Sequence, residues 1–329
     1  MGYALKRRRR SKKAAGVPLR RGRAVVVSPL RYPGAKRRLA GYVSALLELN
    51  SLKPKLFVEP FAGGASVALQ LLAAGDVERI ALGEKDPWVA SFWKVVFFDT
   101  AWLVERVRRI SVTLRQWRHF RRGGFRCDRD RAIACLFLNR TSFSGILSES
   151  AGPIGGHEQT SDYAIDCRFT RETIIRRIER IAELRDKVEF VQAGDWHRAM
   201  NRASTSGYAD EDVFYYLDPP FYAKADRLYR HWFEEADHLA LRDYMARLKS
   251  PWLISYDPAV EIIKLYADRS VGESIRHVDL LYSAAASAFP NPVREVVITS
   301  ASRLPRATRL WRSSSEWRPR ASGRMAKAS

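Results

Sequence analysis

The run Leu217-Asp218-Pro219-Pro220-Phe221 follows directly after an apolar segment, residues 213–217. Neither proline can donate a backbone hydrogen bond, so the backbone presents carbonyl oxygens at a fixed φ. This arrangement suits a planar amino group: the Asp218 carboxylate accepts one N–H and the Pro219 carbonyl accepts the other. Phe221 would cover the face of the ring. A lone Asp-Pro commonly opens an ordinary turn, but the second proline and the aromatic residue favour the binding site.

A second candidate site is the segment 57–64, Phe-Val-Glu-Pro-Phe-Ala-Gly-Gly, which joins an expected strand to an expected helix. Small residues at such a turn let a nucleotide-like ligand approach the backbone beyond the carboxyl ends of the strands. The segment does not match GxGxxG and is a weak signal by itself. Glu84 stands about 20 positions later, where an acid commonly accepts hydrogen bonds from ribose hydroxyls, and Asp86 is the nearby alternative.

The elements that would position these residues alternate along the chain. Strands are expected at 55–59, 79–82, 188–191, 213–217, 252–255 and 296–298, and helices at 65–74, about 235–249 and 258–266. Strand alternating with helix predicts an α/β fold with a mostly parallel sheet covered on both faces. Between the two α/β stretches, helical spacing at 102–120, 129–139 and 171–184 surrounds a Gly/Ser-rich loop at 141–161.

The net charge of +21 is concentrated at the two ends of the chain. Residues 1–38 contain 14 Lys/Arg and no acid, and residues 303–329 contain eight Lys/Arg and one Glu, so residues 39–302 are neutral. Cationic arms on a neutral body favour a polyanionic partner, because each Lys or Arg that meets a phosphate releases counterions. Solvated, disordered tails are the alternative interpretation, and charge alone does not separate DNA from RNA.

Other classes of protein are disfavoured. No apolar run approaches the length of a membrane helix, and the basic start lacks a signal-peptide core. The three cysteines form no CxxC pattern and the six histidines show no ligand spacing, so no disulfide framework or metal site is expected. We therefore expect a cytoplasmic protein without a metal.

The order of several motifs resembles one family. Tyr-Pro-Gly-Ala-Lys at 32–36, Val-Glu-Pro-Phe-Ala-Gly-Gly at 58–64, a helical insert with Leu-Asn-Arg-Thr at 138–141, and Asp-Pro-Pro-Phe at 218–221 follow the order of the Dam-type adenine-specific DNA methyltransferases. Arg294-Glu295-Val296-Val297-Ile298 is similar to that family's last strand. The resemblance covers about residues 28–300.

The resemblance implies a Rossmann-like class I methyltransferase fold with a mostly parallel seven-stranded sheet. It implies transfer of a methyl group from S-adenosylmethionine to the N-6 amino group of a flipped-out adenine in duplex DNA. Asp218, Pro219, Pro220 and Phe221 match the catalytic motif. The residues that match cofactor contacts are Tyr32, Lys36, Glu59, Pro60, Phe61, Gly63, Glu84, Asp195 and Asp218. The chain departs from the family at Ala35 (usually Gly), Glu84 (usually Asp) and Phe221 (usually Tyr).

DNA recognition is expected in the insert, at Arg140, Ser142 and Ser144. Arg140 suits bidentate pairing with guanine; a phosphate contact or internal packing are equal alternatives. The expected division is a disordered basic arm at 1–25, a discontinuous catalytic domain at 26–98 and 186–302, a helical target-recognition insert at 99–185 and a basic tail at 303–329.

The partner implied by the resemblance is double-stranded DNA. The resemblance is also compatible with a companion restriction endonuclease, with a monomer or weak dimer, and with a prokaryotic, phage or plasmid origin. Methylation of an amino group in RNA and an inactive DNA-binding homologue are the alternative functions, and the Asn139-Arg140-Thr141 segment favours DNA.

Overall fold

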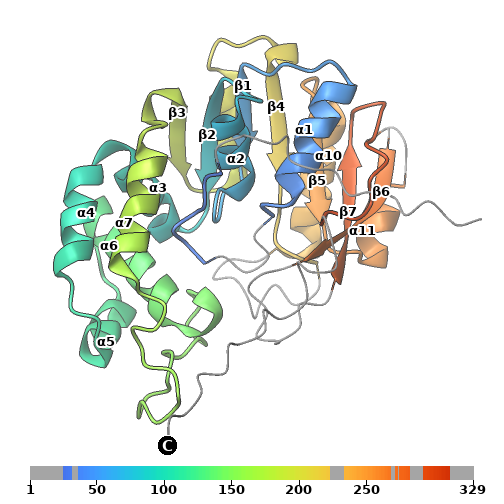
Figure 1. The fold of residues 1–329 in the computed structure, drawn as a ribbon. Coiled ribbons are helices and arrows are strands. Elements are labelled where there is room, and N and C mark those ends of the chain that lie inside the picture. Colours follow the sequence, from blue (N-terminus) through green and yellow to red (C-terminus); the bar gives the residue numbers. More distant parts are fainter. Residues whose placement is uncertain are drawn as a thin grey trace, which may run out of the picture.

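A computed structural model describes residues 25–31, 36–222, 233–267, 271–272, 274–281 and 292–311. Within them, seven strands form one sheet (Figure 1). The strands are β1 (Leu56–Glu59), β2 (Arg79–Glu84), β3 (Val188–Ala193), β4 (Val213–Leu217), β5 (Trp252–Tyr256), β6 (Ser274–Leu281) and β7 (Pro292–Thr299).

The order of the strands in the sheet is β3-β2-β1-β4-β5-β7-β6. The pairs among β1 to β5 are parallel, and β7 runs antiparallel to both β5 and β6. The predicted seven-stranded, mostly parallel sheet is therefore confirmed. Because the strand order reverses between β1 and β4, a ligand crevice is expected beyond the carboxyl ends of these two strands.

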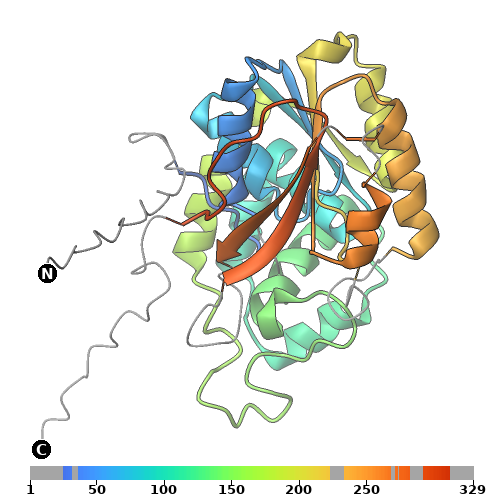
Figure 2. The ribbon, with the colours of Figure 1, turned by 90° about the vertical axis from the view of Figure 1, so that its right-hand side faces the viewer.

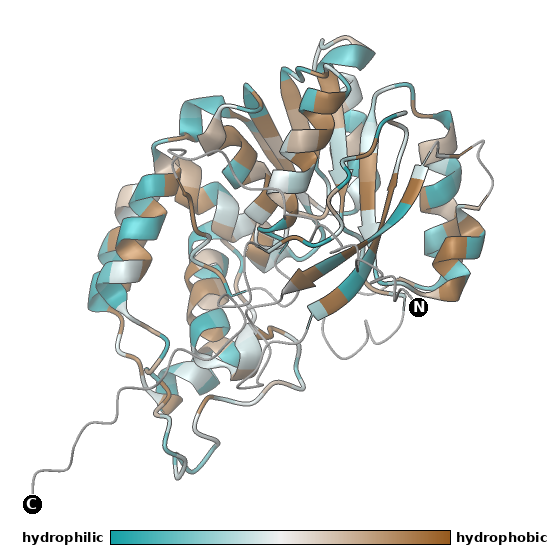
Figure 3. Cartoon of the chain, turned by 45° about the vertical axis from the view of Figure 1, so that its right-hand side comes forward, coloured by the Kyte–Doolittle hydropathy of each residue, from teal (hydrophilic) through white to brown (hydrophobic). Residues whose placement is uncertain are grey.

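The helices α1 (Leu39–Leu49), α2 (Ser66–Ala74) and α3 (Pro87–Phe98) pack into one hydrophobic cluster with one side of the strands. The helices α8 (Trp196–Ser204), α10 (Glu235–Arg247) and α11 (Val260–Leu265) form a second cluster with the other side. The side view shows α1 and α10 on opposite faces of the sheet (Figure 2). Hydropathy follows this layering, since the strands are predominantly hydrophobic and the helices carry hydrophilic outer sides (Figure 3).

The middle of the chain is helical, as expected. It contains α4 (Thr100–Arg109), α5 (Leu114–Arg122), α6 (Asp128–Thr141) and α7 (Arg171–Ala182), which lie beside the β3 edge of the sheet (Figure 1). Short 3-10 turns follow at η1 (Phe143–Gly145), η2 (Arg185–Lys187) and η3 (Asp210–Asp212). These helices share the hydrophobic cluster of α1, α2 and α3. The division into a catalytic domain and an insert stays a prediction.

Some elements differ from the expectation. The single helical stretch expected at 102–120 is two helices, because residues 110–113 are not helical and Ile110 and Thr113 adopt extended backbone. The Thr113 hydroxyl caps α5 by accepting from the Gln116 N–H at 3.1 Å. Strand β6 and helices α1, α3 and α8 were not expected. No helix in the described part of the chain has the length and apolar character needed to cross a membrane.

Candidate active site

Asp218 follows the last residue of β4, so the strand delivers its carboxylate to the carboxyl edge of the sheet. Its Oδ1 accepts a hydrogen bond from Ser255 Oγ of β5 at 2.9 Å and lies 3.1 Å from Lys36 Nζ. The side chain keeps 25% of its surface exposed. Burial raises the pKa of Asp218, and the Lys36 charge and the Ser255 hydroxyl oppose that rise. The carboxylate is therefore held in one position and remains open to a ligand.

Lys36 joins two carboxylates. Its Nζ lies 2.6 Å from Glu295 Oε1 of β7 as well as 3.1 Å from Asp218 Oδ1, and its side chain is only 3% exposed. Burial works against the charge of Lys36, but the two carboxylates outweigh it and raise the pKa of Lys36 above its usual value. Burial raises the pKa of Glu295 to about 7, although Lys36 opposes this rise. Asp218, Lys36 and Glu295 therefore form one charged triad, in which Asp218 is the member that a ligand can reach.

Glu295 was not among the expected site residues. The available signal was an acid inside an apolar strand segment, Glu295-Val296-Val297-Ile298. A buried carboxylate in a strand needs a partner, and here the partner comes from 259 positions away.

The residues after Asp218 cover the site. Pro219 is buried, and Pro220 and Phe221 are partly exposed. Lys36 Nζ lies 5.2 Å from the centroid of the Phe221 ring, which joins this ring to the triad. The Tyr222 N–H donates to Asp257 Oδ1 at 2.9 Å and anchors the chain where it leaves the motif.

The segment 59–64 forms the second wall. Glu59 Oε2 accepts from the Ala68 N–H in the first turn of α2 at 3.0 Å, and burial raises the pKa of Glu59 well above its ordinary value. Gly63 has a φ of 44°, in the left-handed region that favours glycine. Its N–H donates to Glu84 Oε2 at 2.8 Å, and its carbonyl accepts from Trp93 Nε1 at 2.8 Å. The glycine is thus held from both sides.

Gly83, which was not expected at the site, allows this wall to approach the sheet. A Cβ at Gly83 would stand 2.5 Å from the Ala199 Cβ, closer than real Cβ atoms approach, and 3.0 Å from the Pro60 Cα. The neighbouring Phe61 is partly exposed and packs edge-on against Phe233, with ring centroids 5.6 Å apart. A glycine inside the apolar strand segment 79–84 was the available signal.

Glu84 ends β2 and is nearly buried. Besides Gly63, its carboxylate accepts the Asp86 N–H at 2.9 Å. Burial raises the pKa of Glu84 to about 7 against the effect of these backbone hydrogen bonds. The alternative acid, Asp86, caps α3 instead, because its Oδ1 accepts the Trp88 N–H at 2.8 Å.

Asp195 lies just beyond β3, beside Glu84: the Gly194 N–H donates to the Glu84 carbonyl at 2.9 Å. Asp195 Oδ1 caps α8 by accepting the His197 N–H at 2.9 Å, and it also lies 2.8 Å from His197 Nδ1. The side chain is 44% exposed. Tyr32 lies outside the described residues.

The three residues expected to contact DNA are not equally accessible. Ser142 is fully buried and its Oγ accepts the Trp117 indole N–H at 3.0 Å. It therefore has no surface from which to contact a base, and its expected DNA contact is replaced by a structural role in positioning Trp117. Arg140 is 8% exposed, so little of its side chain faces solvent. Ser144 is partly exposed in η1 with a φ of 54°.

Asn139 connects this region to the active site. Its Oδ1 accepts the Arg31 N–H at 2.6 Å, and its Nδ2 donates to the carbonyls of Arg31 and Gly145, each at 2.8 Å. A Cβ on Gly145 would stand 2.3 Å from the Arg31 carbonyl oxygen, so glycine is required for this approach. The hydrogen bonds with Asn139 hold the Arg31 backbone, five positions before Lys36.

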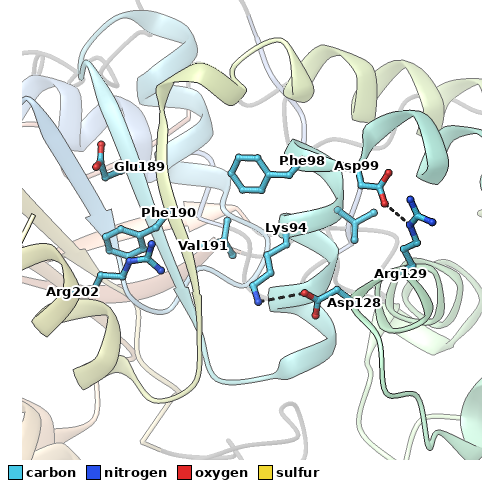
Figure 4. A pocket seen from close by; sticks show the side chains of 10 residues that line it. Lys94, Phe98, Asp99, Asp128, Arg129, Glu189, Phe190, Val191 and Arg202 are labelled. Atoms are coloured by element: carbon cyan, nitrogen blue, oxygen red, sulfur yellow. Dashed lines mark hydrogen bonds and ion pairs between the residues drawn. The ribbon is translucent and has the colours of Figure 1, made fainter.

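A separate hollow of about 440 Å³ lies at the β3 edge of the sheet (Figure 4). Its lining includes Phe190, whose ring lies 4.4 Å from the Arg202 guanidinium, and none of its lining residues belongs to the expected site. In the described ranges, no three His, Cys, Asp or Glu side chains are grouped to hold a metal ion.

Comparison with known proteins assigns the family. No curated protein matches the chain. Among solved structures, the rRNA methyltransferase aviRa from Streptomyces viridochromogenes matches in two structures. The two structures are 12% and 10% identical to this chain, with TM-scores of 0.38 and 0.34. The matches cover 82% and 80% of this chain and 87% and 85% of the matched chains. A sequence model of the D12 class N6 adenine-specific DNA methyltransferases matches residues 32–284, most of the chain. The chain therefore belongs to the family of D12 class N6 adenine-specific DNA methyltransferases.

Proposed function

We propose that this enzyme methylates N-6 of a flipped-out adenine in duplex DNA, within a specific sequence, and that Asp218 and Pro219 hold the amino group. One observation carries the assignment of residues: a partly exposed carboxylate at the carboxyl end of β4 is fixed by a buried lysine and a serine hydroxyl. A carboxylate held in this way acts as a preorganised hydrogen-bond acceptor.

The adenine must leave the base stack before its amino group can reach the site, at a cost of a few kcal/mol. The partly exposed Phe221, three residues after Asp218, offers a stacking face. Stacking of a base on an aromatic side chain contributes about 1–3 kcal/mol, which offsets part of that cost.

The chemistry follows from the two acceptors. The lone pair of the adenine amino nitrogen is delocalised into the ring, so the nitrogen is a weak nucleophile. Hydrogen bonds from this amino group to the Asp218 carboxylate and the Pro219 carbonyl localise the lone pair. They also stabilise the positive charge that develops on nitrogen during transfer. The surplus proton leaves after transfer, so a separate general base is not needed.

S-adenosylmethionine, the donor that the methyltransferase family implies, supplies an electrophilic methyl group when it is bound. The residues present fit a nucleoside. Glu84 offers a carboxylate that can accept hydrogen bonds from ribose hydroxyls, and Gly63 has no side chain between a ligand and the backbone. Phe61 lies on the loop between these two residues. We assign Lys36, Glu59, Pro60 and Asp195 to the same pocket, with Lys36 and Glu59 acting through their contacts to Asp218 and α2. Tyr32 is assigned from the sequence alone.

Cofactor affinity should depend on pH through Glu84. Its pKa is raised to about 7 by burial, so the carboxylate is ionised above that pH and protonated below it. A ribose hydroxyl forms a strong hydrogen bond with the ionised Glu84 carboxylate and only a weak one with the protonated carboxyl group. We therefore expect the Kd for S-adenosylhomocysteine to rise as the pH falls from 8 to 6, approaching tenfold per pH unit below 7. Isothermal titration calorimetry at several pH values measures this.

The Glu84→Gln variant should bind more weakly at pH 8 and show a flat pH profile. Asp86→Asn is the matched control: asparagine caps a helix as well as aspartate does, so this variant should keep the pH dependence, with its midpoint moved to lower pH because the Asp86 charge helps to raise the pKa of Glu84. A Glu84→Gln variant with an unchanged pH profile would remove Glu84 from the cofactor site.

The function itself is tested by expressing the enzyme in a host that lacks DNA methylation and sequencing the host DNA with modified adenines identified base by base. We expect N6-methyladenine within one short recurring sequence. Unmodified DNA, together with methyl transfer to RNA in vitro, would contradict the proposal. The recurring sequence would also show whether a companion restriction endonuclease is to be sought.

A further inference from the structure

Arg140 carries a buried charge with incomplete compensation. The residue stands in the last turn of α6 and is 8% exposed. Its Nε and Nη2 atoms are buried and have no hydrogen-bond partner in the described part of the chain. An unpaired guanidinium removed from water is costly to a folded protein.

Among the residues that the structure describes, the charged groups that act on Arg140 are arginines. Burial, followed by the charges of Arg177, Arg31 and Arg168, lowers the pKa of Arg140 to about 9. Arg31 and Arg177 are partly exposed and Arg168 is exposed, so the buried guanidinium has a cationic rim that reaches solvent. We call Arg31, Arg140, Arg168 and Arg177 the arginine cluster. Repulsion within the cluster adds to the cost of the unpaired charge, and a bound anion would remove both.

We propose that the arginine cluster is the binding site for one phosphodiester group of the DNA substrate. A guanidinium presents several N–H donors in a plane, which matches the oxygens of a phosphate. The buried depth and several converging cations favour a single tightly held anion. The inference rests on the proposed function in one respect, that duplex DNA is the substrate.

The chain also limits where the phosphate lies. Arg31 and Lys36 are five residues apart, so their Cα atoms are separated by at most about 18 Å, and Lys36 contacts Asp218 at 3.1 Å. The Arg and Lys side chains extend this span at both ends, and DNA rises about 3.4 Å per base pair along each strand, so the phosphate should lie within about one turn of the duplex from the target adenine.

The test compares binding of a labelled duplex that contains the methylated sequence, with S-adenosylhomocysteine present, over a series of salt concentrations. The variants are Arg140→Gln and, because a buried substitution can impair folding, Arg168→Gln at the exposed rim. Arg180→Gln is the matched control: Arg180 is exposed on the same helix as Arg177 and pairs with Glu183. In a second series, single phosphates near the target are replaced by neutral methylphosphonates.

We expect both cluster variants to weaken binding about tenfold or more and to lower the slope of log K against log salt by about 0.9, the value for one phosphate. The control should match the wild type. One methylphosphonate position should weaken the wild type but not Arg140→Gln. Because the substitution removes an uncompensated charge, Arg140→Gln should unfold at a temperature no lower than the wild type.

Three results would overturn the inference. The first is an Arg140→Gln variant that melts at a lower temperature and keeps the wild-type salt slope, which indicates a packing role. The second is equal sensitivity of wild type and variant to every methylphosphonate. The third is stabilisation of the wild type by inorganic phosphate with unchanged DNA binding in both cluster variants, which indicates an adventitious ion only.

Failure of this inference is distinguishable from failure of the proposed function. If the wild type methylates adenine in DNA and the cluster variants bind like the control, only the inference fails. If the wild type methylates no DNA, the salt series is run on a duplex of arbitrary sequence; cluster variants that still bind more weakly there, with the lower salt slope, leave the site standing while the function fails.

Discussion

Replacing Asp218 with alanine should lower kcat for methyl transfer by about a hundredfold to a thousandfold, the scale seen when a preorganised polar group at a reacting centre is removed. The variant loses the acceptor that fixes the adenine amino group and stabilises the charge developing on it. Lys36 keeps Glu295 as a partner at 2.6 Å, so the loss of one carboxylate does not leave the lysine unpaired. The enzyme should therefore stay folded while losing its activity.

Single-turnover transfer of a labelled methyl group to duplex DNA measures the rate, and calorimetry with S-adenosylhomocysteine measures cofactor binding. Ser255→Ala is the graded control, since it removes only the 2.9 Å hydrogen bond to Asp218 and should cost far less than Asp218→Ala. An Asp218→Ala variant with near-normal single-turnover rates would refute the mechanism. A large loss of thermal stability would instead assign Asp218 to folding.

The local parts of the site could be predicted from the sequence because each follows a strand directly. The run that contains Asp218 and the segment before Gly63 both show an apolar strand interrupted by proline or glycine, a signal contained within eight residues. The positions of β1 and β4 could be predicted from the same proline and glycine residues that follow them. Such short-range signals need no knowledge of the neighbouring strands.

The pairing between distant segments could not be predicted in this way. Lys36 and Glu295 are 259 positions apart. Lys36 precedes α1 and Glu295 lies in β7, and the strand order β4-β5-β7, which brings Glu295 near the end of β4, is not visible in the local sequence. Strand β6 was missed because charged and polar residues interrupt its apolar ones, as in Ser274-Ile275-Arg276-His277-Val278. An edge strand needs burial on fewer sides, so its apolar pattern is weaker.

The DNA-contact residues show a different limit. Ser142 was chosen for its residue type and its place in a motif, but a hydroxyl serves equally well as a buried acceptor for the Trp117 indole. Spacing does not separate these two uses. Burial does, and burial here depends on the packing of α5 against α6, which the sequence pattern did not reveal.

Replacing Lys36 with methionine should destabilise the enzyme by about 3–5 kcal/mol, the usual effect of removing one partner from a buried ion pair. Asp218 and Glu295 would then face each other without a cation in a site where burial already raises the pKa of Glu295 to about 7. Without Lys36 that pKa rises further. A carboxyl whose folded pKa exceeds its unfolded pKa loses stability as the pH rises between the two values. The variant should therefore unfold more easily at pH 8 than at pH 5, with a steeper pH dependence than the wild type.

A double substitution isolates the cause. Glu295→Gln removes one carboxylate, so Lys36→Met combined with Glu295→Gln should regain part of the stability lost by Lys36→Met and lose most of the added pH dependence. Glu295→Gln alone leaves the 3.1 Å pair of Lys36 and Asp218 in place and should change stability least. Urea denaturation at pH 5 and pH 8 for the four proteins completes the cycle. Strictly additive free energies of unfolding would show that Lys36 and Glu295 are not coupled, and that the three groups do not act as one triad.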